Sequence, residues 1–166
     1  MAEISQRCSM PLAATQSLFR WLVFNVLVGN TDAHLKNLSF LVAGDDVQLA
    51  PFYDLLSTAV YETCAFGKSR WPDQVDMAWP IQGSSRMRLI EAAQTLGIPG
   101  AAAKRQLAFM RKNIQEQATL LLEEVQQENA DLLQQRPELA ATFAGEMRCL
   151  RAIVHVVIQD MYNQTA

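Results

Sequence analysis

The chain has 166 residues, with 14 Lys and Arg against 17 Asp and Glu, so its formal net charge is −3 and its pI is about 5.4. This length suits one domain, or one lobe of a larger one, and the acidic balance argues against a broad nucleic-acid-binding face. Half of the residues are apolar and 19% are charged, which excludes extensive disorder, and the three scattered cysteines match neither a zinc knuckle nor a disulfide framework.

The first predicted helix runs from about Thr15 to Gly29. Thr15 can cap its start, and Gly29 can end it in a left-handed turn. Apolar residues cover nearly its whole circumference, so we expect the helix to be buried. Asn25 lies on its main apolar face.

A polar run, residues 30–37, follows this helix and leads into a predicted β-hairpin. Residues 38–42 and 47–50 read as two short strands, because β-formers flank a turn at residues 44–46. The proline at position 51 then predicts extended backbone into residues 52–54.

Residues 55–83 lack periodicity, and we expect a long irregular segment there. From residue 84 to about residue 163 the chain reads as a helical bundle. Its helices are predicted at about 84–96, 101–127 and 137–162, and the polar stretch 126–135 reads as a link between the last two. The predicted fold class is therefore mainly α with one small β-hairpin.

The chemistry is concentrated between Asn30 and Asp54. A buried helix, a polar loop, a hairpin and a further acid follow in order, which should bring Asp32, Asn37 and Asp54 within reach of one another. Phosphoryl transfer uses such a set, because Asp can accept the proton of a substrate hydroxyl, while Asn and Asp oxygens suit Mg²⁺. The spacing D-x-x-x-x-N alone is weak, and its combination with the hairpin and the second Asp is stronger.

Two motifs resemble those of the HipA-like toxin kinases. Residues 25–37, NVLVGNTDAHLKN, resemble the catalytic-loop signature of that family, and residues 49–58, LAPFYDLLST, resemble its metal-binding segment. Residues 77–83, MAWPIQG, more loosely resemble a following stretch that usually forms a small strand. The resemblance covers most of the chain and implies the C-terminal lobe of a two-lobed, protein-kinase-like fold.

The resemblance also implies roles for individual residues. Asp32 would be the catalytic base, and Asn37 and Asp54 would hold Mg²⁺ and, through it, ATP. Lys36 could contact a phosphate or the substrate. His34 would orient the loop or line the site. In this scheme residues 30–37 form the catalytic loop, 38–50 the hairpin, 51–58 the metal-binding segment and 55–83 a region like an activation segment.

The family further implies partners and a compartment. Its members are bacterial serine/threonine protein kinases of toxin–antitoxin systems, neutralised by a helix-turn-helix antitoxin through which alone they would contact DNA. The best-known members phosphorylate glutamyl-tRNA synthetase, so an aminoacyl-tRNA synthetase is one candidate substrate. Free thiols and the absence of an apolar run of membrane-spanning length fit the bacterial cytoplasm.

Three departures from ordinary protein kinases matter. Thr31 stands where those kinases carry an Arg before the base, and Leu55-Leu56 follow Asp54 in place of Phe-Gly. An N-terminal lobe, with its Gly-rich loop and strand lysine, is not seen in the sequence. We therefore expect the isolated chain to be inactive or weakly active unless that lobe is supplied in cis or in trans.

Alternative interpretations stay open. The chain could be a non-catalytic remnant, or a split-kinase subunit that binds the antitoxin or the substrate, or it could be a small-molecule kinase on the same scaffold. Asp32 and Asn37 could merely cap a turn, Lys36 could be a solvated lysine, and His34 is favoured as a structural hydrogen-bonding residue.

Overall fold

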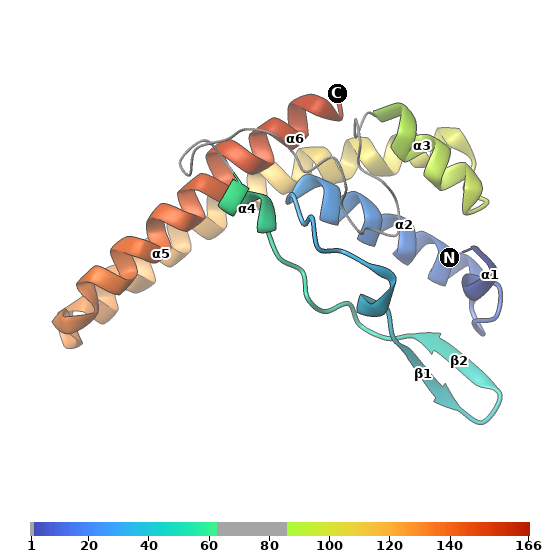
Figure 1. The fold of residues 1–166 in the computed structure, drawn as a ribbon, viewed down its shortest axis with the longest axis horizontal. Helices are drawn as coiled ribbons and strands as arrows, with labels where there is room; N and C mark the ends of the chain where they lie inside the picture. The colour runs from blue at the N-terminus through green and yellow to red at the C-terminus, as the bar shows by residue number, and fades with distance from the viewer. Residues whose placement is uncertain (1, 63–85) are drawn as a thin grey trace.

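The computed structural model describes residues 2–62 and 86–166 and is mainly helical, with one two-stranded antiparallel hairpin (Figure 1). The elements are α1 (Ala2–Ser5), α2 (Pro11–Leu27), η1 (Leu35–Asn37), β1 (Phe40–Ala43), β2 (Asp46–Leu49), η2 (Thr58–Glu62), α3 (Arg86–Thr95), α4 (Gly100–Gln135), η4 (Pro137–Leu139), α5 (Ala140–Ala152), η5 (Ile153–Val157) and α6 (Ile158–Gln164). Of these, η1, η2 and η4 are 3₁₀ turns and η5 is a π-helical turn. The predicted fold class is confirmed.

Helix α2 is the centre of the core, as its apolar composition predicts. It begins at Pro11, earlier than expected, because proline suits the first helical turn. Thr15 is therefore inside the helix and does not cap it; its hydroxyl donates to Ser5 Oγ at 3.0 Å. Gly29 has a φ of 65°, so the predicted left-handed turn after the helix is confirmed. Phe19, Val23 and Leu27 of α2 form the core together with side chains from α3, α4 and α6, among them Ala93, Leu107 and Met161.

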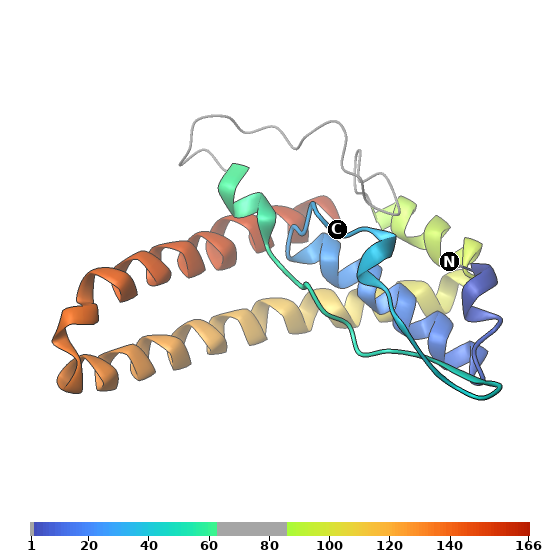
Figure 2. The ribbon, with the colours of Figure 1, turned by 60° about the horizontal axis from the view of Figure 1, so that its bottom comes forward.

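The hairpin lies beside the start of α2 (Figures 1 and 2). Its register pairs Phe40 with Leu49 and Ala43 with Asp46, so two residues form the turn, and Gly44 supplies the positive φ of 62°. The backbone N–H of Ser9 donates to the carbonyl of Val47 at 2.9 Å. This contact fixes the hairpin against the link between α1 and α2.

The C-terminal helices form a long antiparallel arm (Figure 2). The predicted link at residues 126–135 is wrong, since α4 continues as a helix to Gln135. Likewise, the single helix predicted from Pro137 is divided into a 3₁₀ turn, α5, a π-helical turn and α6. A second apolar cluster, formed by Ala118, Leu122, Met147, Val154 and Ile158, holds the arm together.

Parts of the predicted irregular segment 55–83 can be described. Residues 55–57 have no regular structure and η2 follows them, whereas residues 63–83, with the strand expected at 77–83, lie outside the described residues, as do Ser84 and Ser85. Extended backbone was predicted into residue 54, but Asp54 has a φ of 56°. In the described ranges, no helix is both long and apolar enough to cross a membrane.

Candidate active site

The end of α2 is fastened by two buried asparagines. Asn25, which is fully buried, donates from Nδ2 to the Trp21 carbonyl at 2.8 Å, so its side chain is held against its own helix. Its Oδ1 accepts a hydrogen bond from Asn30 Nδ2 at 2.8 Å, and its carbonyl accepts from the Asn30 N–H at 2.8 Å. Because Asn30 is only 1% exposed, water cannot replace these bonds freely.

Asn30 joins the loop 30–37 to the segment 51–58. Its Nδ2 also donates to the carbonyl of Asp54 at 3.1 Å, and its Oδ1 accepts from the backbone N–H of Asp32 at 3.1 Å. One side-chain amide therefore links the backbones of the two acids that the sequence singles out. Asp32 and Asp54 are 22 residues apart in the sequence, and the buried side chain of Asn30 holds their backbones close together.

A threonine pair makes a second connection between the same segments. Thr58 Oγ1 accepts from the Thr31 N–H at 2.7 Å, and the two hydroxyl oxygens are also 2.7 Å apart. The Ala59 N–H adds a bond to the Gly29 carbonyl at 3.0 Å. Thr31 therefore connects the loop to Thr58 through both its backbone N–H and its hydroxyl.

Asn37 and Asp54 meet directly. Asn37 ends η1 and is 5% exposed, and its Nδ2 donates to Asp54 Oδ2 at 2.8 Å. The positive φ of Asp54, which Asp adopts more readily than most residues, turns this exposed carboxylate toward the loop.

This pair fits a magnesium ion that arrives with phosphates. The hydrogen bond uses the Asn37 nitrogen, so the Asn37 Oδ1 and the Asp54 carboxylate remain as hard oxygen donors. Protein sites for Mg²⁺ commonly supply one or two such groups and leave the remaining positions to water and substrate phosphates. No cluster of three or more His, Cys, Asp or Glu side chains that could hold a metal occurs in residues 2–62 and 86–166.

The other predicted site residues lie around this pair. Asp32 and Lys36 are exposed, and the Lys36 carbonyl accepts a hydrogen bond from the Tyr53 hydroxyl at 2.7 Å. His34 is half-buried, and its buried Nδ1 has no hydrogen-bond partner within the described residues. The structure thus brings Asn37 and Asp54 into contact and joins Asp32 to them through Asn30, whereas no side-chain hydrogen bond involving Lys36 or His34 is found in the described part.

Sequence reasoning missed the residues that hold the acids in place, namely Asn25, Asn30, Tyr53 and Thr58. A signal for Asn25 was present, because an amide on the apolar face of a buried helix must find a partner there. Thr58 offered no such signal, since its partner is 27 residues away in the sequence.

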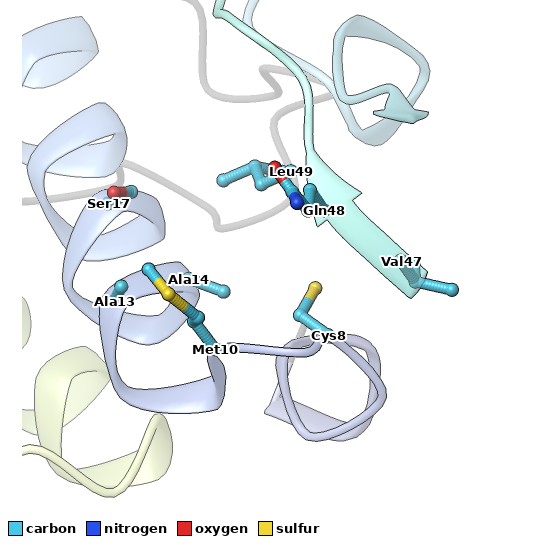
Figure 3. A pocket seen from close by; sticks show the side chains of 8 residues that line it. All are labelled: Cys8, Met10, Ala13, Ala14, Ser17, Val47, Gln48 and Leu49. Carbon is cyan, nitrogen blue, oxygen red and sulfur yellow. The ribbon is translucent and has the colours of Figure 1, made fainter. Parts of the chain in front are cut away.

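A separate pocket of about 170 Å³ lies between the start of α2 and strand β2 (Figure 3). None of the predicted site residues lines it, so it is not where these acids would meet a phosphate. Its lining consists of Cys8, Met10, Ala13, Ala14, Ser17, Val47, Gln48 and Leu49.

Comparison with known proteins gives one family. Residues 1–129 match the sequence model of the HipA-like C-terminal domain. The chain is 42% identical over 59 residues to the serine/threonine-protein kinase toxin HipA of Shewanella oneidensis, an alignment that spans 36% of this chain and 14% of that protein. Over 60 residues it is 43% identical to Y4mE, a kinase-named protein of Sinorhizobium fredii, again spanning 36% of this chain and 14% of the relative.

A solved structure shows the same fold. It is the complex of HipA, HipB and operator DNA from the toxin–antitoxin system of Shewanella oneidensis MR-1. The match has a TM-score of 0.58 at 24% identity and covers 98% of this chain but 36% of that one. The chain therefore corresponds to about a third of the solved protein, and the predicted C-terminal lobe of a HipA-like fold is confirmed.

Proposed function

Since this chain belongs to the HipA-like C-terminal domain family, we propose that it provides the catalytic lobe of an ATP- and Mg²⁺-dependent serine/threonine protein kinase. The contact between Asn37 and Asp54, made next to a loop that carries Asp32, is the observation that supports this most directly. Kinase catalysis depends on the positioning of the reacting groups and on neutralisation of the phosphate charge. The hydrogen bonds described above serve the first need, because they hold Asp32, Asn37 and Asp54 in place.

Asp32 acts as the base in this proposal. Its backbone is fixed by Asn30, while its side chain is exposed and free to meet a substrate. The carboxylate accepts the proton of a Ser or Thr hydroxyl as that oxygen attacks the γ-phosphorus of ATP, and ADP leaves. Lys36, two residues beyond His34 on the exposed side of the loop, is placed to meet a phosphate or the substrate.

Asn37 and Asp54 hold the metal. The Asn37 amide and the Asp54 carboxylate are kept together by their hydrogen bond and present oxygen atoms to one ion. Mg²⁺, when bound there with ATP, would neutralise charge on the phosphates. His34 supports the loop, because its carbonyl accepts the Asn37 N–H at 3.0 Å and so closes the turn that presents Asn37.

The wider proposal follows the relatives. An N-terminal lobe, in cis or in trans, would grip the nucleotide, and a helix-turn-helix antitoxin like HipB would bind the kinase and make its DNA contacts. The substrate would be a protein, with an aminoacyl-tRNA synthetase as one candidate, in the bacterial cytoplasm. The antitoxin part of this proposal is supported by the solved HipA–HipB–operator complex, whose HipA has the same fold.

Phosphate transfer by the complete kinase that contains this lobe tests the proposal. Asp32→Asn keeps size and hydrogen bonding but cannot accept the proton, so the transfer rate should fall by about 10²- to 10⁴-fold. Asp45→Asn is the matched control, because Asp45 is an exposed acid in the hairpin turn. Equal transfer rates for Asp32→Asn and the control would contradict the assigned base, whereas no transfer by the wild type would favour the non-catalytic remnant.

A further inference from the structure

The π-helical turn η5 contains two buried valines, Val154 and Val157, that pack against different parts of the molecule. The backbone N–H of Ile158 donates to the carbonyl of Ile153, five residues earlier, so the turn accommodates one residue more than an α-helical turn. Val154 joins the cluster inside the arm, beside Ala118. Val157 instead packs away from that cluster, on η2. Turns of this kind are frequent at functional sites.

Val157 packs on η2, the turn that begins at the last residue of the segment 51–58. It is 2% exposed and forms one apolar cluster with Ala59 and Val60, which are 4% and 5% exposed. Cys149, Ala152 and Ile153 are half-buried around them. Figure 1 shows η2 resting on the helix that runs from α5 into α6.

The same turn carries the bonds that reach the loop 30–37. Thr58 Oγ1 accepts from the Thr31 N–H, and the Ala59 N–H donates to the Gly29 carbonyl. The Thr31 bond is part-buried, and the Ala59 bond joins two buried residues, so both bonds keep their geometry only while the apolar contact holds η2 in place. Val157 supplies that contact from the opposite end of the chain.

We propose that Val157 is a positioning residue, whose packing on Ala59 and Val60 keeps Asp54 and the loop of Asp32 in their mutual arrangement. The role in metal binding rests on the proposed function; the role in fixing η2 does not. The arm of C-terminal helices would in this way support the reacting acids, although Val157 lies outside the two sequence motifs.

Amide hydrogen exchange tests the first part. Val157→Ala and Val154→Ala remove the same two methyl carbons from buried positions of one turn, so both lower overall stability to a similar extent. We expect Val157→Ala to speed exchange of the Thr31 and Ala59 amides about 10-fold more than Val154→Ala does. Equal exchange of these two amides in both variants would overturn the proposal.

Titration with Mn²⁺ tests the second part. Broadening of the Asn37 and Asp54 amide resonances reports the ion at this pair, and Asp54→Asn identifies broadening that arises elsewhere. We expect Val157→Ala to need about 5-fold more Mn²⁺ than Val154→Ala for half of the effect. Equal requirements would overturn the proposal. Faster exchange in Val157→Ala, together with no specific broadening in the wild type, would support the positioning role and contradict the proposed metal site.

Discussion

Asn37 donates a hydrogen bond from its side chain to the carboxylate of Asp54, 17 residues later, at 2.8 Å. The hairpin between them makes this contact possible, because its two strands run antiparallel and return the chain to the end of the loop. One partner is buried and the other exposed, so the amide is rigid and the carboxylate remains open to a ligand.

Asn37→Ala removes both the hydrogen bond and one oxygen donor. We expect the Mg²⁺ concentration for half-maximal nucleotide binding to rise about 10- to 100-fold, the range seen when the surroundings of a metal are disturbed. Calorimetric titrations of ATP at fixed Mg²⁺ concentrations measure this. Asn163→Ala, at an exposed position of α6, is the control. A magnesium requirement like that of the control would show that Asn37 is not a ligand.

Thr58→Val keeps the shape of the side chain and removes the acceptor of the Thr31 N–H. An N–H left without a partner costs about 1–3 kcal/mol, so urea unfolding should show a loss of that size. Thr58→Ser retains the hydroxyl and should stay closer to the wild type. If Thr58→Val is as stable as the wild type while Thr58→Ser is destabilised, the methyl group and not the hydrogen bond is what Thr58 contributes.

Asn30→Ala should be the most damaging of the asparagine variants. The change leaves the Asn25 Oδ1, the Asp54 carbonyl and the Asp32 N–H without this partner at a nearly fully buried position. We expect a loss of about 2–3 kcal/mol in the free energy of unfolding, with Asn163→Ala, at an exposed position of α6, as the matched control. A loss below about 0.5 kcal/mol would mean that water replaces the amide.

The link between α1 and α2 gives a pH-dependent prediction. Hydrogen bonds from the Ser9 hydroxyl, and next from the Gln48 amide, hold the pKa of Asp46 below its ordinary value. A carboxylate with a lowered folded pKa stabilises the fold above its unfolded pKa, and the stabilisation disappears as the pH falls through the folded pKa. Ser9→Ala should therefore raise the Asp46 pKa, and the part of the stability difference that comes from ionised Asp46 should vanish at low pH, leaving only that from the Ser9 bonds to Val47.

A carboxyl-carbon NMR titration of Asp46 measures this shift, and Ser9→Thr, which keeps a hydroxyl, is the control. An Asp46 pKa that is the same in Ser9→Ala and in the wild type would show that the Ser9 bond does not persist in solution.

The sequence is most informative where a local pattern has only one stable solution. The helix over most of α2, the left-handed Gly29 and the hairpin were predictable, because apolar periodicity and turn residues agree there. The approach of Asn37 to Asp54 also follows from the hairpin. The polar composition of residues 126–135 predicted a link, but these residues are the end of α4. A helix in a two-helix arm exposes most of its surface, so it can be largely polar.

Other features depend on tertiary contacts that no local pattern encodes. The π-helical turn at Ile153–Val157 accommodates one extra residue, and its two buried valines, Val154 and Val157, pack in different clusters. Asp54 has a positive φ, and the side chains of Asn30 and Asn37, both in the loop 30–37, donate hydrogen bonds to its carbonyl and its carboxylate. Both features concern the surroundings of the candidate site, where local preferences are most often overridden.

The most direct test of the central claim is an ATP titration by calorimetry, with and without Mg²⁺, on the wild-type chain, Asp54→Ala and the control Asp45→Ala. The account predicts weak binding that requires Mg²⁺, persists in the control and is lost in Asp54→Ala. Nucleotide binding of equal strength in the wild type and in Asp54→Ala, or with and without Mg²⁺, would contradict it.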